Sequence, residues 1–201
     1  HTLNAFDDAM IEAFHEELTA LIADPAGGLL LTGAGRATCA GRDTDIVSDP
    51  DYHGEGHPFL DEIGPLIRKY PLPTAMAGKG AVVGMGFEYS LACDFVVFGE
   101  DTHVSFPEIK YGIDISDLVG ELTRYVNPRV AKEIVMTGEV IEPERAYELG
   151  LANDVVAEDA VEERTRELLE TVVRNDADIL ENMLSVTRFD EETTPTGSDS
   201  K

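Results

Sequence analysis

Two glutamates stand beside glycine and proline in apolar parts of this sequence. Glu88 follows a glycine-rich turn, and Glu108 follows Phe106-Pro107 at the expected end of a strand. Two carboxyl groups around one water can act together when one is ionised as a base and the other is protonated as an acid. With 40 acidic residues in the chain, both glutamates are equally well read as surface residues, and Glu88 also suits the first turn of a helix. Spacing alone leaves both interpretations open.

The run Gly84-Met85-Gly86 precedes a helix-forming segment. N–H groups at a helix N-terminus point outward with partial positive charge, which suits an oxygen that becomes negative during a reaction. The alternative is an ordinary helix start, because many helices begin after glycine. A phosphate-binding P-loop is excluded, since no Gly-Lys-Ser/Thr follows.

A second glycine-containing loop, GAGRATCAGRD at residues 33–43, leaves an apolar run. Glycine there lets backbone approach a ligand closely. The competing interpretation is a plain turn between a strand and a helix.

The elements that must position these residues follow from apolar periodicity. Helices are expected over residues 5–23, 58–70, 87–92, 117–125, 128–137, 146–150 and 160–173, and strands over 29–32, 74–77, 95–98, 104–106 and 153–156. Strands that alternate with helices predict an α/β layered fold. We expect one core domain over residues 1–188, a polar and mobile segment at 44–56, and an acidic, disordered tail at 189–201.

The charge balance limits the possible partners. The 40 acidic residues outnumber the 15 basic ones, which gives a formal net charge of −25. Nucleic acids and anionic membranes are therefore poor partners. Acidic residues spread along a chain with few lysines suggest a halophile, because salt screens their repulsion.

Histidine and cysteine give no sign of metal or disulfide chemistry. The five histidines lack metal-ligand spacing, so no metal site is expected. Cys39 and Cys93 are expected to be buried thiols. With no signal peptide and no apolar run of membrane-spanning length, the sequence predicts a cytoplasmic protein.

Four stretches, in this order, carry a family resemblance: TGAGRATCAGRD, YPLPTAMAGKGAVVGMGFEYSLACD, VSFPEIKYGI and IVMTGEVIEPERAYELGLANDVV. They resemble the crotonase superfamily, also called the enoyl-CoA hydratase/isomerase family, over about residues 3–156. The resemblance implies the α/β fold shared by crotonases and Clp proteases, with layered β-sheets surrounded by helices. Relative to the family, the N-terminal strands and C-terminal helices are expected to be absent.

By this resemblance, the backbone N–H groups of Arg42 and Met85 form an oxyanion hole, and Glu88 and Glu108 are the two catalytic glutamates. The loop around residues 40–43 also receives the adenine end of CoA. The remaining residues expected to bind CoA or substrate are Ala40, Gly41, Asp43, Gly84, Gly86 and Pro107. No cofactor is implied, because the CoA thioester is the substrate.

The sequence departs from the family pattern at two places. Met85 replaces a glycine beside the oxyanion hole, and IDISDLVGEL follows Gly112 where hydratases carry a stretch rich in proline and glycine. Asp114 and Asp117 lie in that segment. An acid there moves protons in dienoyl-CoA isomerase relatives, although in so acidic a chain solvent exposure is the favoured reading.

The two glutamates favour an enoyl-CoA hydratase. The alternatives are an enoyl-CoA isomerase (Δ3,Δ2 or dienoyl) on the same scaffold and a non-catalytic acyl-CoA-binding protein. A serine protease of the related fold is disfavoured, because Ser90 and Ser105 lack a nucleophile setting. The resemblance also implies a homo-oligomer, either a trimer or a dimer of trimers.

Overall fold

Two small β-sheets form the centre of the molecule in the computed structural model, which describes residues 2–49 and 57–188. The first sheet is parallel, with the strand order β1 (Leu29–Leu31), β2 (Thr74–Gly78), β4 (Phe95–Gly99) and β7 (Asp154–Val156). In the second, β3 (Ala81–Val83) pairs parallel to β5 (His103–Ser105), and β5 pairs antiparallel to β6 (Val140–Ile141). The predicted α/β fold of layered sheets surrounded by helices is confirmed.

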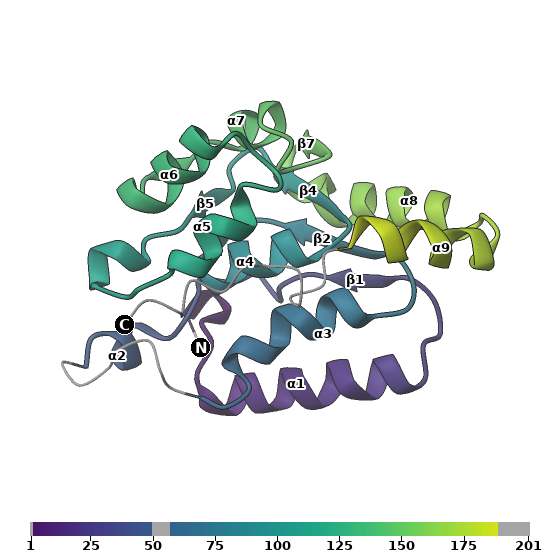
Figure 1. Cartoon of the computed structure of the whole chain (residues 1–201), viewed down its shortest axis with the longest axis horizontal. Helices are drawn as coiled ribbons and strands as arrows, with labels where there is room; N and C mark the ends of the chain where they lie inside the picture. Colours follow the sequence, from purple (N-terminus) through teal and green to yellow (C-terminus); the bar gives the residue numbers. More distant parts are fainter. Residues whose placement is uncertain (1, 50–56, 189–201) are drawn as a thin grey trace, which may run out of the picture.

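Helices cover both faces of the parallel sheet (Figure 1). On one face α8 (Val161–Val173) packs against β2 and β4, where Val161 joins Ala77 and Val97 in a small apolar cluster. On the other face lies α4 (Met85–Ala92), followed by α3 (Ile63–Lys69) and α1 (Asp8–Ala23). Burial on both faces explains why β2, with the sequence TAMAG, is buried at every position.

The main core fixes the segments that carry the two predicted glutamates. Phe87 in α4 and Phe106 after β5 are both fully buried, and their ring centroids are 4.8 Å apart. Glu88 directly follows the first of these rings, and Glu108 lies two residues after the second. Packing of the two rings therefore brings the two carboxyl-bearing segments to the same side of the core.

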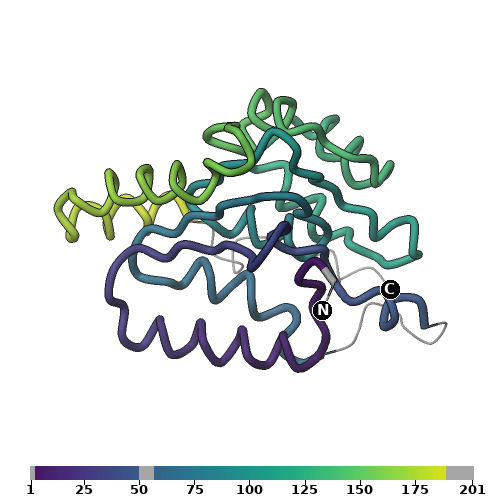
Figure 2. The backbone as a smooth tube through the Cα atoms, turned by 180° about the vertical axis from the view of Figure 1, so that it is seen from behind, coloured from purple at the N-terminus to yellow at the C-terminus, as the bar shows by residue number. Residues whose placement is uncertain are grey.

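The remaining helices complete the outer layer. They are α2 (Thr44–Val47), α5 (Ser116–Leu122), α6 (Pro128–Thr137), α7 (Pro143–Glu148) and α9 (Ala177–Thr187), with 3-10 turns at Thr2–Asn4, Leu60–Glu62, Glu108–Tyr111 and Glu158–Ala160. Figure 2, seen from behind, shows α8 and α9 together at one end of the molecule. The predicted tail at 189–201 and most of the predicted mobile segment, residues 50–56, lie outside the described residues.

Several element boundaries differ from the sequence prediction. Helix α1 begins at Asp8 rather than at residue 5, because the Asp7 carboxylate accepts the Met10 N–H as an N-cap. Strands β3 and β6 and helix α9 were not predicted, and α2 occupies the start of the segment over 44–56 that was expected to be mobile. The expected helix over 58–70 is a 3-10 turn followed by α3.

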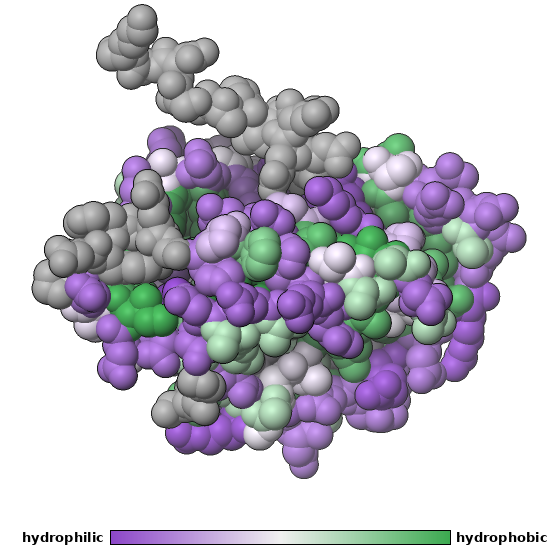
Figure 3. All heavy atoms as spheres, turned by 90° about the horizontal axis from the view of Figure 1, so that it is seen from below, coloured by the Kyte–Doolittle hydropathy of each residue, from purple (hydrophilic) through white to green (hydrophobic). Residues whose placement is uncertain are grey.

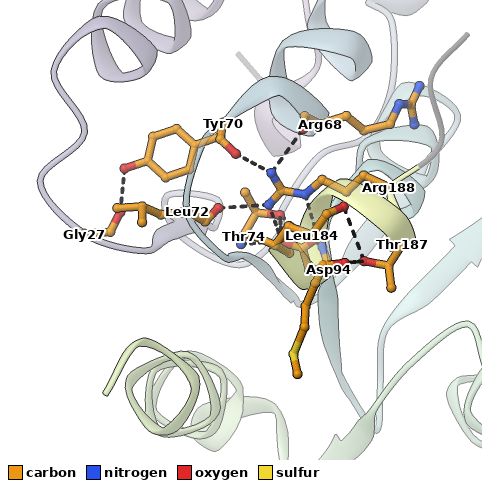
Figure 4. Close-up of polar contacts among 10 residues, drawn as sticks. Gly27, Arg68, Tyr70, Leu72, Thr74, Asp94, Leu184, Thr187 and Arg188 are labelled. Carbon is orange, nitrogen blue, oxygen red and sulfur yellow. Dashed lines mark hydrogen bonds and ion pairs between the residues drawn. The ribbon is translucent and has the colours of Figure 1, made fainter. Parts of the chain in front are cut away.

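Arg188, which follows α9, ties that helix to the body of the protein (Figure 4). Its guanidinium binds both carboxylate oxygens of Asp94 and donates to the carbonyls of Arg68, Tyr70 and Leu72. Asp94 also accepts bonds from the Thr74 N–H and hydroxyl, at 2.7 and 2.9 Å. One guanidinium thus joins the end of α9 to the ends of α3 and α4.

The surface is predominantly hydrophilic on the face drawn in Figure 3, with apolar residues in small groups between charged ones. No helix within the described ranges has both the length and the apolar character that crossing a membrane requires. Cys39 and Cys93 are free and buried, as predicted.

Candidate active site

The loops that carry Arg42 and Met85 both begin at one β-bridge, between Cys39 and Val82. Cys39 and Val82 form a parallel β-bridge, in which the Cys39 carbonyl accepts the Val83 N–H at 3.0 Å. Arg42 and Met85 each lie three residues beyond their bridged residue. The two predicted N–H donors thus occupy equivalent positions in the two adjacent loops.

The Arg42 N–H points away from Phe6, whose backbone pairs with the residues on either side of Arg42. Phe6 donates to the Gly41 carbonyl at 2.8 Å and accepts from the Asp43 N–H at 3.0 Å. Successive N–H groups of extended backbone point in opposite directions, so the N–H of Arg42 faces away from Phe6. Within the described ranges it has no hydrogen-bond acceptor. The Arg42 guanidinium instead turns towards α1, where it binds the Phe6 carbonyl and Asp8.

Met85 is the first residue of α4, so its N–H has no acceptor inside the helix. The carbonyl of Gly84 accepts from the N–H groups of Phe87 and Glu88, at 2.9 and 3.0 Å. Among the described residues none accepts the N–H of Met85. Gly84 begins the helix at φ 55° and ψ −119°, a conformation that favours glycine.

The two loops touch and open onto one large cavity. A Cβ on Gly41 would lie 3.0 Å from the Val83 carbonyl oxygen. The cavity beside this contact has a volume of about 740 Å³, which is within the usual range for small-molecule sites. Of the predicted site residues it is lined by Ala40, Gly41, Arg42, Gly84, Met85, Glu88, Pro107 and Glu108.

Two predicted residues support the loops instead of lining this cavity. Asp43 caps α2, where its carboxylate accepts the Asp45 N–H at 2.9 Å. Gly86 lies against Cys39, and a Cβ there would come within 2.8 Å of the cysteine Cβ. Neither residue lines the cavity, and a contact of either with the ligand stays a prediction.

Glu108 lies directly beside the Gly84 turn. A Cβ on Gly84 would lie 2.3 Å from Glu108 Oε1. The other carboxyl oxygen, Oε2, is buried and has no hydrogen-bond partner within the described ranges. Burial raises the pKa of Glu108 to about 7. The carboxyl group therefore exchanges protons near neutral pH.

Glu88 lies in the first turn of α4 and faces α3. Its Oε1 would lie 3.5 Å from a Cβ on Gly64, and Arg68 Nη2 would lie 3.4 Å from the same point. Burial, followed by the negative charge of Glu121, raises the pKa of Glu88 to about 8. The positive charge of Arg68 opposes this increase, and Glu108 adds only a small part of it.

An ion pair that was not predicted forms part of the cavity wall. Arg68 Nη1 lies 2.7 Å from Glu121 Oε1, and both residues line the cavity together with Asp61. The two partners are 53 positions apart, so no local sequence pattern could have paired them.

Asp114 and Asp117, expected to be solvent-exposed or to move protons, are exposed and also line the cavity. The protease alternative gains nothing, because Ser90 donates its hydroxyl to the Phe87 carbonyl inside α4 and does not line the cavity. No cluster of metal-ligating side chains occurs within the described part of the chain.

Comparison with known proteins identifies the class. The family model for Enoyl-CoA hydratase/isomerase matches residues 1–197. A putative enoyl-CoA hydratase of Thermus thermophilus is 30% identical over 181 residues, covering 86% of this chain and 70% of that protein. An enoyl-CoA hydratase structure from Bacillus anthracis superposes with a TM-score of 0.82 at 27% identity, covering 91% of this chain and 73% of that one. The chain therefore belongs to the enoyl-CoA hydratase/isomerase family of enzymes.

One relative shows how far such a likeness extends. The fatty acid oxidation complex subunit alpha of Psychrobacter is 30% identical over 188 residues, which cover 88% of this chain and 26% of that protein. The likeness is thus restricted to about a quarter of that subunit, so family membership carries over and the larger protein's complete activity does not.

Proposed function

We propose that this protein is an enoyl-CoA hydratase, which adds water across the C2=C3 bond of a 2-enoyl-CoA thioester. The observation that carries the proposal is that Arg42, Met85 and the two glutamates line one cavity, and that neither N–H group has an acceptor among the described residues. The CoA thioester is itself the substrate, and the reaction needs no cofactor.

In this proposal the thioester carbonyl oxygen accepts hydrogen bonds from the N–H groups of Arg42 and Met85. Negative charge grows on that oxygen when the C2=C3 bond is attacked. Donors that are fixed before the reaction stabilise such charge, and removing one typically costs about 3 kcal/mol of transition-state stabilisation. Because both donors are backbone groups, the side chains at these positions can be as different as arginine and methionine.

We assign separate tasks to the two glutamates, and the larger increase in the pKa of Glu88 supports this assignment. Between about pH 7 and about pH 8, Glu108 is mainly ionised and Glu88 mainly protonated. The Glu108 carboxylate takes a proton from water as the water oxygen bonds to C3, and the C2=C3 electron pair moves to C2 and the thioester oxygen. Glu88 then gives its proton to C2, which restores the thioester carbonyl. The product is a 3-hydroxyacyl-CoA.

The test is hydration of trans-2-butenoyl-CoA by the protein and by its Glu88→Gln and Glu108→Gln variants. General acid–base groups typically contribute about 10²–10⁴-fold, so each variant is expected to lose that much in kcat. The exposed Glu100→Gln variant serves as the matched control. Full activity in both active-site variants would refute the proposal.

An isomerase on the same scaffold is the second candidate, and Asp114 at the cavity is the observation that favours it. Incubation with 2-enoyl and 3-enoyl thioesters separates the two, because hydration yields a 3-hydroxyacyl product and isomerisation only moves the double bond. Acyl-CoA binding without turnover of either thioester would instead indicate a non-catalytic binding protein.

The family resemblance also supports a homo-oligomer, either a trimer or a dimer of trimers. The spread of 40 acidic residues along the chain supports the cytoplasm of a halophile. Light scattering at high salt tests the assembly by its mass.

A further inference from the structure

A second cavity, of about 380 Å³, lies behind the first. Its walls are mainly apolar, and α9 supplies part of them through Leu180, Met183 and Leu184. The Asp94–Arg188 ion pair lies at its polar end, and Figure 4 shows it among the carbonyl groups that surround it. A cavity of this kind suits a hydrocarbon chain.

The two cavities follow one another along the same face of α4. Met85 and Glu88 line the first, whereas Leu91 and Ala92 line the second. Positions three and four apart on a helix lie on one face, one turn after another. An acyl chain that extends past Glu88 along this face would therefore be directed towards the second cavity.

Arg68 stands between the two cavities and lines both. On the opposite side, Glu121 lines the first cavity and Tyr125 the second. The Arg68–Glu121 ion pair, at 2.7 Å, joins α3 to α5 at this point, with side chains 13% and 20% exposed. The ion pair therefore lies at the boundary between the linings of the two cavities.

We propose that the Arg68–Glu121 pair limits the enzyme to short acyl chains, and that the apolar cavity behind it accepts the end of a longer chain once the pair is removed. This inference rests on the proposed function. A hydrocarbon end pressed against the pair strips water from both charges and offers no hydrogen bond in return, which opposes binding. The pair is thus a specificity determinant, and the substrates are short 2-enoyl-CoA thioesters.

The experiment compares kcat/KM for trans-2-butenoyl-CoA and trans-2-decenoyl-CoA. Loss of water from the charged pair without a hydrogen bond in return weakens binding of the longer chain, so we expect the wild type to favour the shorter substrate by at least about 100-fold. The double variant Arg68→Ala/Glu121→Ala leaves no unpaired buried charge. It also removes two opposite influences on Glu88. Its preference is expected to move towards decenoyl-CoA by at least about tenfold, a fraction of what six methylenes can contribute.

Two further variants keep the test specific. Arg145→Ala/Glu133→Ala removes an exposed pair at 2.8 Å, away from both cavities, and should leave the chain-length ratio unchanged. Adding Leu184→Phe to the double variant narrows the second cavity, and should reduce the gain with decenoyl-CoA while butenoyl-CoA is still hydrated.

Binding of the saturated esters butyryl-CoA and decanoyl-CoA, measured by calorimetry, gives a readout that is independent of turnover. If no enoyl ester is hydrated but the double variant gains affinity for decanoyl-CoA, the hydratase proposal fails, whereas the proposed role of the Arg68–Glu121 pair in limiting chain length stands. That role is refuted if the wild type hydrates both chain lengths equally well, or if the folded double variant keeps the wild-type ratio of kcat/KM values.

Discussion

Glu88 and Glu108 reach their raised pKa values in different surroundings. Burial acts on both, but only Glu88 also has neighbouring charges, Glu121 and Arg68, with substantial and opposite effects. The raised value of Glu108 comes from burial beside the Gly84 turn. A difference of about one pKa unit between like groups is enough to give them different protonation states near neutral pH.

A pH profile tests this assignment. The active form needs Glu108 ionised and Glu88 protonated, so the hydration rate should rise as pH passes about 7 and fall as it passes about 8. The Glu88→Gln variant, with no titrating group at that position, should lose the fall near pH 8 in its residual rate. The measurement is kcat/KM for trans-2-butenoyl-CoA from pH 5 to 10. A wild-type rate that is constant between pH 6 and 9 would contradict the assignment.

At the scale of elements, the turn that begins α4 determines how closely Glu108 can approach the start of this helix. Gly84 has a φ of 55°, and the carboxyl group of Glu108 occupies the space that a side chain at this position would need. Gly35 also has a positive φ, 76°, but nothing lies within 4 Å of its missing Cβ. The two glycines therefore differ in the space that surrounds their missing Cβ.

Gly84→Ala and Gly35→Ala form the matched comparison. Gly35→Ala should lose about 1 kcal/mol of unfolding free energy through backbone strain. Gly84→Ala should be strained more, because its φ of 55° and ψ of −119° lie outside the left-handed helical region. Gly84→Ala should lose at least about 1 kcal/mol more and most of its hydration activity, because Glu108 must move. Urea unfolding and initial rates measure the two effects. Equal losses of stability and activity in the two variants would show that the contact with Glu108 is unimportant.

The Arg188 anchor of α9 supports another prediction at this scale. Arg188→Ala leaves the Asp94 side chain, which is 10% exposed, without its guanidinium partner and should cost about 3 kcal/mol, the lower end for a broken buried pair. Limited proteolysis should then cut α9 before the rest of the molecule. Arg174→Ala, which removes an exposed pair with Glu170, should change neither result. Unchanged protection of α9 would mean that its apolar contacts hold it without Arg188.

The sequence predicted the elements with strong periodicity and missed those that depend on distant partners. Helix α6 was predicted from its first residue to its last, because Pro128 and Gly138 mark its ends. Strand β3 is three residues long between glycines, and it is a strand only because Cys39 and β5 pair with it. Strand β6, with two residues, depends in the same way on β5.

The site shows the same division. Most of the predicted residues line the cavity. They could be predicted because each lies within a short motif that is contiguous in sequence. Asp43 and Gly86 were assigned to the ligand, whereas they hold the loops, a distinction that needs side-chain directions. Arg68 and Glu121 could not be found, because an ion pair between α3 and α5 arises only from tertiary packing.

For the whole molecule, the dominant property is its charge. The net charge of −25 is spread over the chain, and self-repulsion of this kind opposes the compact state until salt screens it. The free energy of unfolding should therefore rise by at least about 1 kcal/mol between 0.1 and 2 M KCl, since screening reduces this repulsion. Urea unfolding at both salt concentrations measures the change. Equal stability at the two concentrations would argue against adaptation to salt.

The common offset of Arg42 and Met85 from the Cys39–Val82 bridge constrains how this chain can change. A single inserted residue in either loop would advance one N–H by about 3.3 Å and reverse its direction. Substitutions that keep the glycines preserve the backbone path, whatever the size or charge of the new side chain. These loops are thus expected to tolerate changes of residue type but not changes of length. Gene variants that alter loop length are expected to lose turnover while they still fold.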